Sequence, residues 1–232
     1  MKRACYITTL VGIIFLLFII LNKSWKSEDN KLEGRTLNEF ASEEYLKEKD
    51  ASELKFYPTI EEAVCSCDWD EYSVSRIEKV VKVIQGEDSC DVFFIVNNKE
   101  KDNFYTFKLK TKQEKQKILY SEPLYAVGTS WELEKYRGRE LEKRYDKEDC
   151  FKQKIISCLG FFNSTGAFSL DKNNKIIKWG LHDNEEIKTL AIDEKRPTEV
   201  VKIKMDGEVV YFWYYENLNL ENAKMQEINI SH

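Results

Sequence analysis

The sequence predicts an α+β protein in which an N-terminal transmembrane helix is followed by a mainly antiparallel β ectodomain with a few short helices. Three observations predict this fold class. One uninterrupted apolar run stands near the start of the chain, at residues 4–21. Short runs of β-branched and aromatic residues follow it, separated by turn-forming residues. Nothing in their order requires parallel crossovers.

The apolar run, ACYITTLVGIIFLLFIIL, has 18 residues and contains neither a charge nor a proline. This is about the length that a helix needs to cross the hydrocarbon core of a bilayer. A cleaved signal peptide would need small residues after the run, whereas the chain continues with NKSW. We therefore expect residues 1–21 to form a cytoplasmic tip and an uncleaved anchor. Because a short basic N-terminus is easily retained, we expect the remaining chain to be extracytoplasmic.

Residues 22–56 predict a charged stalk between the anchor and the folded domain. Lys, Glu, Asp, Ser and Asn dominate this stretch, and a few apolar residues between positions 37 and 45 have the spacing of a short amphipathic helix. The folded domain should then span residues 57–232, either as one unit or as two subdomains that divide near residues 130–150. At its start, Thr59 and Glu62 have the spacing of a capping box, which predicts a short helix that ends near Cys67.

The first part of this domain contains three candidate strands. Residues 90–96 and 104–110 are rich in β-formers, and a polar stretch between them supplies a hairpin loop. The pattern at residues 77–84 fits a helix or a strand. We favour a strand, because residues 86–88 then form a tight turn into the next one. Two further candidate strands, at residues 176–181 and 187–192, are expected to join a sheet with the last hairpin.

The clearest hairpin lies at residues 200–215, where Asp206-Gly207 separates two β-rich runs. Asp-Gly favours a two-residue type I′ turn, whose twist matches that of paired strands. This turn sets the register, so that Met205 faces Glu208. One face of the hairpin is then largely apolar. The opposite face pairs Lys202 with Tyr211 and carries two further rings, Trp213 and Tyr215.

This second face is the candidate binding surface: Lys202, Tyr211, Trp213 and Tyr215. Aromatic rings beside ammonium groups suit the recognition of sugars, peptides or wall polymer. The alternative is that a helix covers the face and that the lysine stem merely lies along it. We favour this second interpretation, in which a helix covers the face.

Composition excludes some classes of partner. From Ser24 onward the chain has 33 basic and 41 acidic residues, a net charge of −8. This charge argues against nucleic acid and against tight binding to anionic lipid. Aromatic residues make up 13% of the chain, which is too many for a disordered polymer.

Five cysteines follow the anchor. Cys150 and Cys158 are close enough in sequence to close a short disulfide loop, and Cys65 or Cys67 is a second candidate partner for Cys90. A metal or redox site at Cys65-Ser-Cys67 is the sharper alternative, but its spacing is not that of structural zinc sites. Three nearby acids, Asp68, Asp70 and Glu71, lack the glycine and the alternation of a calcium loop. We predict neither a metal nor a cofactor.

Catalytic motifs are not found. The chain has two histidines, His182 and His232, and lacks a nucleophile elbow, a phosphate-binding loop and a zinc-protease motif. These observations favour a protein that is not an enzyme. A thiol- or carboxylate-dependent envelope enzyme of unrecognised type is the alternative.

Several segments together resemble a group of proteins: the anchor with its stalk, FYPTIEEAV, IEKVVKVIQ with DVFFIV, WGLHDNEEIKTLAI and the strand that ends in VVYFWYY. In these segments the chain is similar to small uncharacterised membrane-anchored surface proteins of Gram-positive bacteria. The resemblance spans roughly residues 57–217 and rests on strand patterns. It implies a cell-envelope location and an α+β domain, and it brings no catalytic residues. From the anchor, the acidic domain and the lack of catalytic motifs, we expect a single-pass protein of the cell membrane whose ectodomain binds an envelope protein or wall polymer.

Overall fold

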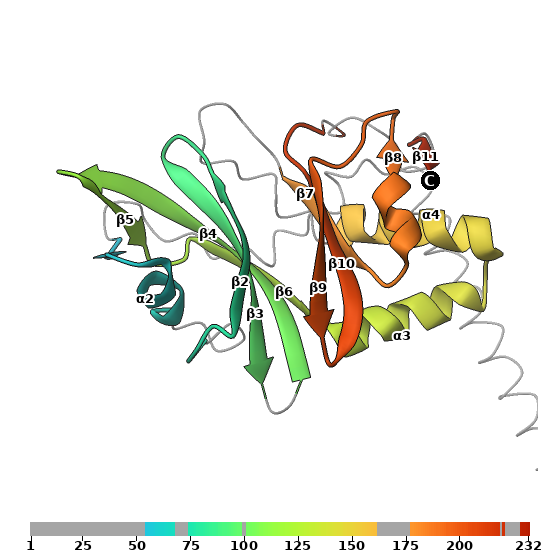
Figure 1. The fold of residues 1–232 in the computed structure, drawn as a ribbon, viewed down its shortest axis with the longest axis horizontal. Helices are drawn as coiled ribbons and strands as arrows, with labels where there is room; N and C mark the ends of the chain where they lie inside the picture. Colours follow the sequence, from blue (N-terminus) through green and yellow to red (C-terminus); the bar gives the residue numbers. More distant parts are fainter. Residues whose placement is uncertain (1–53, 68–73, 99–100, 162–176, 219, 221–227) are drawn as a thin grey trace, which may run out of the picture.

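The computed structural model describes residues 54–67, 74–98, 101–161, 177–218, 220 and 228–232. Its strands are β1 (Phe56–Tyr57), β2 (Lys79–Gln85), β3 (Ser89–Asn98), β4 (Lys101–Glu114), β5 (Lys117–Ser121), β6 (Tyr125–Ser130), β7 (Lys178–His182), β8 (Ala191–Ile192), β9 (Glu199–Met205), β10 (Glu208–Tyr215) and β11 (Ile230–Ser231). Its helices are α2 (Ile60–Cys65), α3 (Trp131–Glu142), α4 (Lys147–Phe161) and the 3₁₀ helix η4 (Glu185–Thr189). The predicted α+β class is confirmed, because antiparallel sheets dominate and the helices are few (Figure 1).

The predicted anchor and residues 22–53 of the predicted stalk precede the described ranges, and Asp68, Asp70 and Glu71 also lie outside them. The predicted end of the stalk at residue 56 is wrong by one residue, because Phe56 begins β1 and pairs with Ser121 of β5. Within the described residues, no helix combines the length and the apolar character that crossing a membrane requires.

The first sheet has the strand order β1-β5-β4-β3-β2, and β6 also pairs with β4. β4 is the long central strand: it pairs with β3 along one edge, and with β6 and then β5 along the other. The predicted strand at residues 77–84 is thus confirmed from residue 79 onward as β2, and those at residues 90–96 and 104–110 are confirmed as parts of β3 and β4. The predicted short helix is confirmed as α2, and the side chain of Thr59 accepts a hydrogen bond from the Glu62 amide at 3.2 Å.

The last hairpin forms the second sheet, which has the order β7-β10-β9. Its register is the predicted one: Met205 pairs with Glu208, and Lys202 pairs with Tyr211. Asp206 and Gly207 have φ values of 51° and 79°, as a type I′ turn requires. The candidate strand at residues 176–181 joins this sheet as β7.

The candidate strand at residues 187–192 is wrong in most of its length. Residues 185–189 form η4, because the side chain of Asn184 accepts a hydrogen bond from the Glu186 amide at 2.9 Å and caps a helical turn. Only β8 is extended, and it pairs with β11 and not with the second sheet. Ile187 and Ile192 are both fully buried, so their apolar character reflects burial in the core and not a strand.

An aromatic cluster joins the two sheets. Phe212 of β10 lies 4.8 Å from Phe93 of β3 and 5.1 Å from Phe104 of β4, measured between ring centroids. Trp179 of β7 completes the cluster, with its ring edge-on to Phe93 at 5.7 Å. The buried core around this cluster contains side chains from both sides of residues 130–150.

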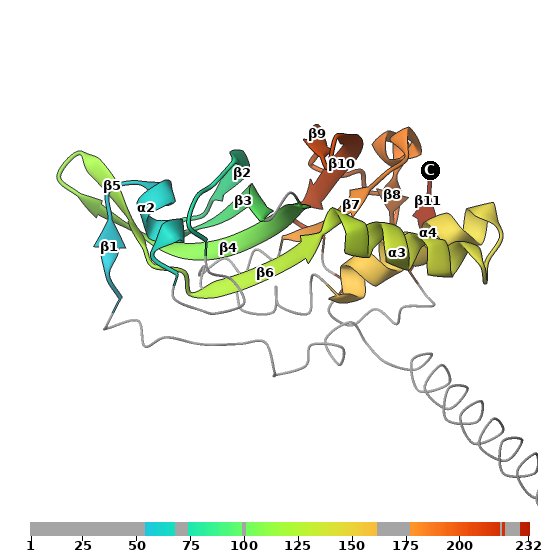
Figure 2. The ribbon, with the colours of Figure 1, turned by 90° about the horizontal axis from the view of Figure 1, so that it is seen from below.

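The other face of the second sheet carries α4, which contacts β7, and α3 packs beside α4 (Figure 2). α3 begins directly after β6, where the side chain of Ser130 accepts a hydrogen bond from the Leu133 amide at 3.2 Å. Glu208 ties α3 to the hairpin, since it accepts hydrogen bonds from Trp131 and Lys135, each at 2.9 Å. The second sheet therefore lies between the first sheet and the two helices.

The type I′ turn provides a test of the hairpin. Gly207→Ala should lower the free energy of unfolding by about 1 kcal/mol, because a Cβ is strained in the left-handed region although no atom lies within 4 Å of it. Chemical denaturation of the variant measures the loss. Asp206→Asn is the matched control, since asparagine tolerates a positive φ, and an equal loss in both variants would contradict the assignment.

Candidate binding groove

The predicted face of β9 and β10 does not form an open surface. Trp213 is fully buried, and Tyr215 and Tyr211 are 3% and 5% exposed. The cover is α4: a Cβ built at Gly180 would lie 2.5 Å from the Trp213 ring and 2.9 Å from Cβ of Cys158 on α4. Of the four predicted residues only Lys202 is exposed. The alternative interpretation, a face covered by a helix, is the one that this packing supports.

A groove of about 650 Å³ opens where this face emerges from under α4. Its walls are the α3–α4 connection, the first turns of α4, the end of β7, η4 and the exposed end of the hairpin. The lining residues are Glu142, Tyr145, Asp146, Lys147, Cys150, Phe151, Lys154, His182, Asp183, Asn184, Glu185, Glu186, Lys202, Val209 and Tyr211. The groove thus contains two of the predicted residues, Lys202 and Tyr211, and neither Trp213 nor Tyr215.

Lys154 of α4 forms the floor between this groove and a smaller cavity of about 220 Å³ that lies between α3 and β7. Its Nζ lies 3.1 Å from Glu142 at the end of α3 and 3.7 Å from Asp183 after β7. Burial lowers the pKa of Lys154, but Asp183 and Glu142 outweigh that effect and raise it. This ion pair holds three elements together at the base of the groove.

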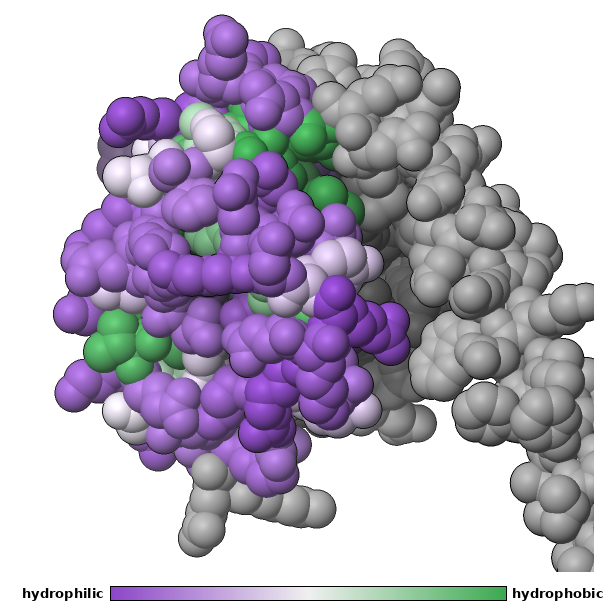
Figure 3. Space-filling view, turned by 90° about the vertical axis from the view of Figure 1, so that its right-hand side faces the viewer, coloured by the Kyte–Doolittle hydropathy of each residue, from purple (hydrophilic) through white to green (hydrophobic). Residues whose placement is uncertain are grey.

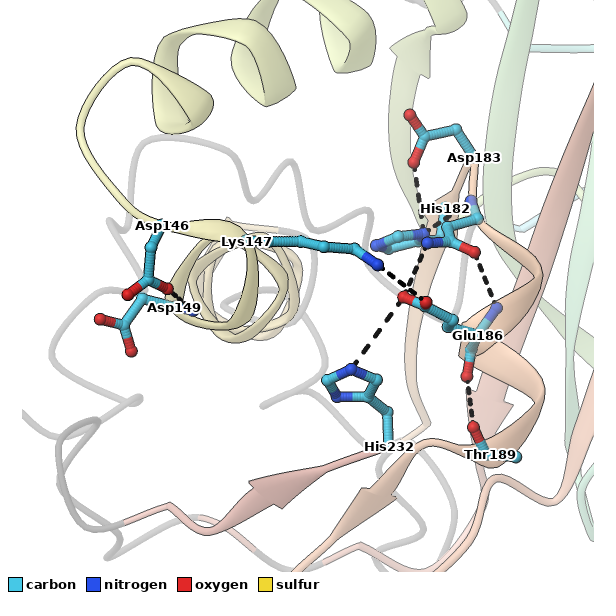
Figure 4. Close-up of polar contacts among 9 residues, drawn as sticks. Asp146, Lys147, Asp149, His182, Asp183, Glu186, Thr189 and His232 are labelled. Atoms are coloured by element: carbon cyan, nitrogen blue, oxygen red, sulfur yellow. Dashed lines mark hydrogen bonds and ion pairs between the residues drawn. The ribbon is translucent and has the colours of Figure 1, made fainter.

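Glu186 of η4 is a second residue with several polar contacts in the groove (Figure 4). It accepts hydrogen bonds from Lys147 of α4 at 3.1 Å and from the side chain of Asn184 at 2.8 Å, and His232 lies 4.0 Å away. The hydrogen bond from Lys147 is the main reason that the pKa of Glu186 is lowered. Figure 4 shows Lys147 and His232 pointing toward this carboxylate from two different segments.

His182 is the most perturbed base of the site. Its Nδ1 accepts a hydrogen bond from the Asn184 amide at 2.9 Å, so the proton of the neutral ring stands on Nε2. Nε2 is buried, and no hydrogen-bond partner for it is found among the described residues. Burial lowers the pKa of His182 to about 4, against the opposing effect of Asp183 at 3.3 Å. The ring is therefore neutral at physiological pH and packs 5.1 Å from Phe151.

Glu134 of α3 lies in the smaller cavity and is the most buried carboxylate there. It accepts hydrogen bonds from Thr129 at 2.6 Å and from Arg137 at 2.8 Å. Burial nevertheless raises its pKa. Both hydrogen bonds end on the same carboxylate oxygen, and they bind Glu134 to the junction of β6 and α3.

The candidate disulfide between Cys150 and Cys158 is contradicted. Both residues stand on α4, eight positions apart, which separates their Cα atoms by roughly 12 Å along a helix, beyond the reach of a disulfide. Cys90 and Cys67 lie together in the core that α2 covers, with Cys65 packed against it, and no disulfide joins them. Burial raises the pKa of Cys150 and Cys158, and that of Cys90 to about 12. These thiols are therefore protonated and poor nucleophiles.

Among the described residues, no group of three or more His, Cys, Asp or Glu side chains is arranged to hold a metal ion. Comparisons with protein-family models, with curated proteins and with solved structures found no match to this chain. The chemistry of the groove is therefore inferred from its own residues. These are paired charges, the partly exposed apolar side chains of Tyr145 and Val209, and the neutral ring of His182.

The sequence analysis did not identify the lysines of α4 or the acids of η4 as residues of the site. Two signals for the helix α4 were present in the sequence. Asp146 precedes a run with helical spacing, and its side chain accepts a hydrogen bond from the Asp149 amide at 3.0 Å, as a helix cap does. Glu148 and Lys152 have the i, i+4 spacing of a helical ion pair and lie 3.2 Å apart.

Proposed function

We propose that this chain is a non-enzymatic, single-pass protein of the cell envelope, with a cytoplasmic N-terminus and an extracytoplasmic domain that binds a partner protein or a surface component in the groove. The observation that carries the proposal is the groove, in which side chains from α4, η4 and β10 meet around a hollow of about 650 Å³. Concave sites with a few placed polar groups are where proteins preferentially bind ligands.

The apolar run at residues 4–21 supports the membrane part of the proposal, and the net charge of −8 from Ser24 onward supports a water-facing domain. The resemblance to membrane-anchored surface proteins of Gram-positive bacteria supports the envelope location. Two features argue against the alternative of a thiol-dependent enzyme. The pKa values of the buried thiols are raised, and a hydrogen bond from the Asn184 amide occupies Nδ1 of His182.

Site-specific photo-crosslinking in intact cells tests the proposal. The full-length chain is made with a photo-reactive amino acid in place of Val209, which lines the groove, or in place of Ile118 of β5, which lies far from it. These two side chains are matched in exposure, at 38% and 46%. We expect a discrete adduct from position 209 and none from position 118. Absence of an adduct at both positions, or the same adduct at both, contradicts binding in the groove.

Alkaline carbonate washing tests the membrane part separately. A chain anchored by residues 4–21 stays with the bilayer, whereas a peripheral protein is released. Release of the full-length chain, or a mature N-terminus after Leu21, would overturn the proposed topology.

A further inference from the structure

The groove has an excess of negative charge. Five carboxylates line it and three ammonium groups oppose them. Lys154, whose side chain is 19% exposed, is already held by Glu142 and Asp183. Lys147 is more open, at 83%, and pairs with Glu186. The side chains of Glu185, Glu142 and Asp183 are 70%, 56% and 53% exposed, although Glu185 also pairs with Lys188 beside the groove. An approaching ligand therefore meets more accessible carboxylates than ammonium groups.

Apolar side chains stand beside these acids at the rim. Tyr145 and Val209 are among the few large apolar side chains that are well exposed, at 40% and 38%. On this side of the molecule hydrophilic residues dominate and hydrophobic patches are small (Figure 3). The Tyr211 ring is already in contact with a cation of the protein itself, since Nζ of Lys188, which also pairs with Glu185, lies 5.5 Å from the ring centroid.

From these observations we infer that the groove binds a basic peptide segment of a partner protein, in which Lys or Arg side chains alternate with an aromatic or aliphatic one. The cations meet Glu185, Glu142 and Asp183 on the parts of these carboxylates that their partners Lys188 and Lys154 leave exposed, and the apolar side chain packs against Tyr145 and Val209. Charge complementarity favours this occupant over an acidic peptide or an anionic polymer. The inference rests on the proposed function and specifies its partner.

Fluorescence anisotropy of labelled probes with the full-length chain in a non-ionic detergent tests the inference, with empty micelles as the blank. The probes are a peptide of repeated Ser-Lys-Tyr, its Ser-Glu-Tyr counterpart and a chitosan oligomer, which is an amino-sugar polymer. We expect the Lys peptide to bind, the Glu peptide to bind at least tenfold more weakly, and binding to weaken as salt rises.

Two charge-reversal variants make the test specific to the groove. Glu185→Lys should weaken binding of the Lys peptide about tenfold, while Glu114→Lys, at the far end of β4, should change it less than twofold. Both variants shift the net charge equally, so nonspecific attraction is matched. Val209→Ser adds a neutral variant that tests the apolar contact, with a loss of about threefold expected. Far-UV circular dichroism and thermal melting show that each variant is folded.

Equal weakening by the two charge reversals, or equal binding of the Lys and Glu peptides, overturns the inference. Binding of the chitosan oligomer without binding of the Lys peptide also overturns it and assigns the groove to an amino-sugar polymer. If none of the three probes binds while position 209 still forms its adduct in cells, the peptide inference fails and the proposed function stands.

Discussion

Trp213→Ala should lower the free energy of unfolding by about 3–5 kcal/mol, the usual cost of removing a large aromatic side chain from a core. The ring is fully buried between β7 and α4, where Gly180 leaves the space that it fills. Its loss leaves a cavity between these two elements. Chemical denaturation of the full-length chain measures the change.

Val209→Ala is the matched control for this prediction. It truncates a residue of the same strand at a 38% exposed site and should cost less than about 1 kcal/mol. If Trp213→Ala left the stability unchanged and instead abolished partner binding, the aromatic face would be an open binding surface and the cover by α4 would be wrong.

The stability of the fold should also depend on His182 as pH falls. Burial holds the pKa of His182 at about 4, below its ordinary value of 6.5. Above pH 6.5 the ring is neutral in both the folded and the unfolded chain, and the full stability is present. Between pH 6.5 and pH 4 the unfolded chain binds a proton that the folded chain does not, so about 3 kcal/mol of stability is lost.

The difference in unfolding free energy between the wild type and His182→Gln, measured from pH 7 to pH 4, isolates this contribution from that of the carboxylates. Glutamine is neutral throughout and can still accept the hydrogen bond from the Asn184 amide. His232→Gln is the control variant, since it replaces a histidine by glutamine at a side chain that is 27% exposed. Parallel pH curves for the wild type and His182→Gln would show that His182 is not buried as described.

The sequence predicted the elements whose geometry is set locally. Asp206-Gly207 determines the turn, the turn determines the register, and Lys202 therefore faces Tyr211 without reference to the rest of the chain. The strand at residues 104–110 is also a local feature, and its period of two residues puts Phe104 and Phe107 in the cores on opposite sides of the first sheet.

The burial of the predicted face could not be read from the same pattern. A strand whose two faces are both apolar has the same sequence whether its second face meets solvent or a helix. Here Trp213 meets Gly180 and α4, which lie more than 30 positions earlier in the chain. The groove depends on such long-range packing too, because Lys147 and Glu186 come from different elements.

The aromatic cluster between the sheets has a consequence for biosynthesis. Phe93 and Phe104 are made more than 100 positions before Phe212, which covers them. Until the ribosome has passed β10, the early sheet exposes two rings to water and to other nascent chains. A polypeptide truncated before residue 212 should therefore aggregate or be degraded, even though every strand of its first sheet is complete.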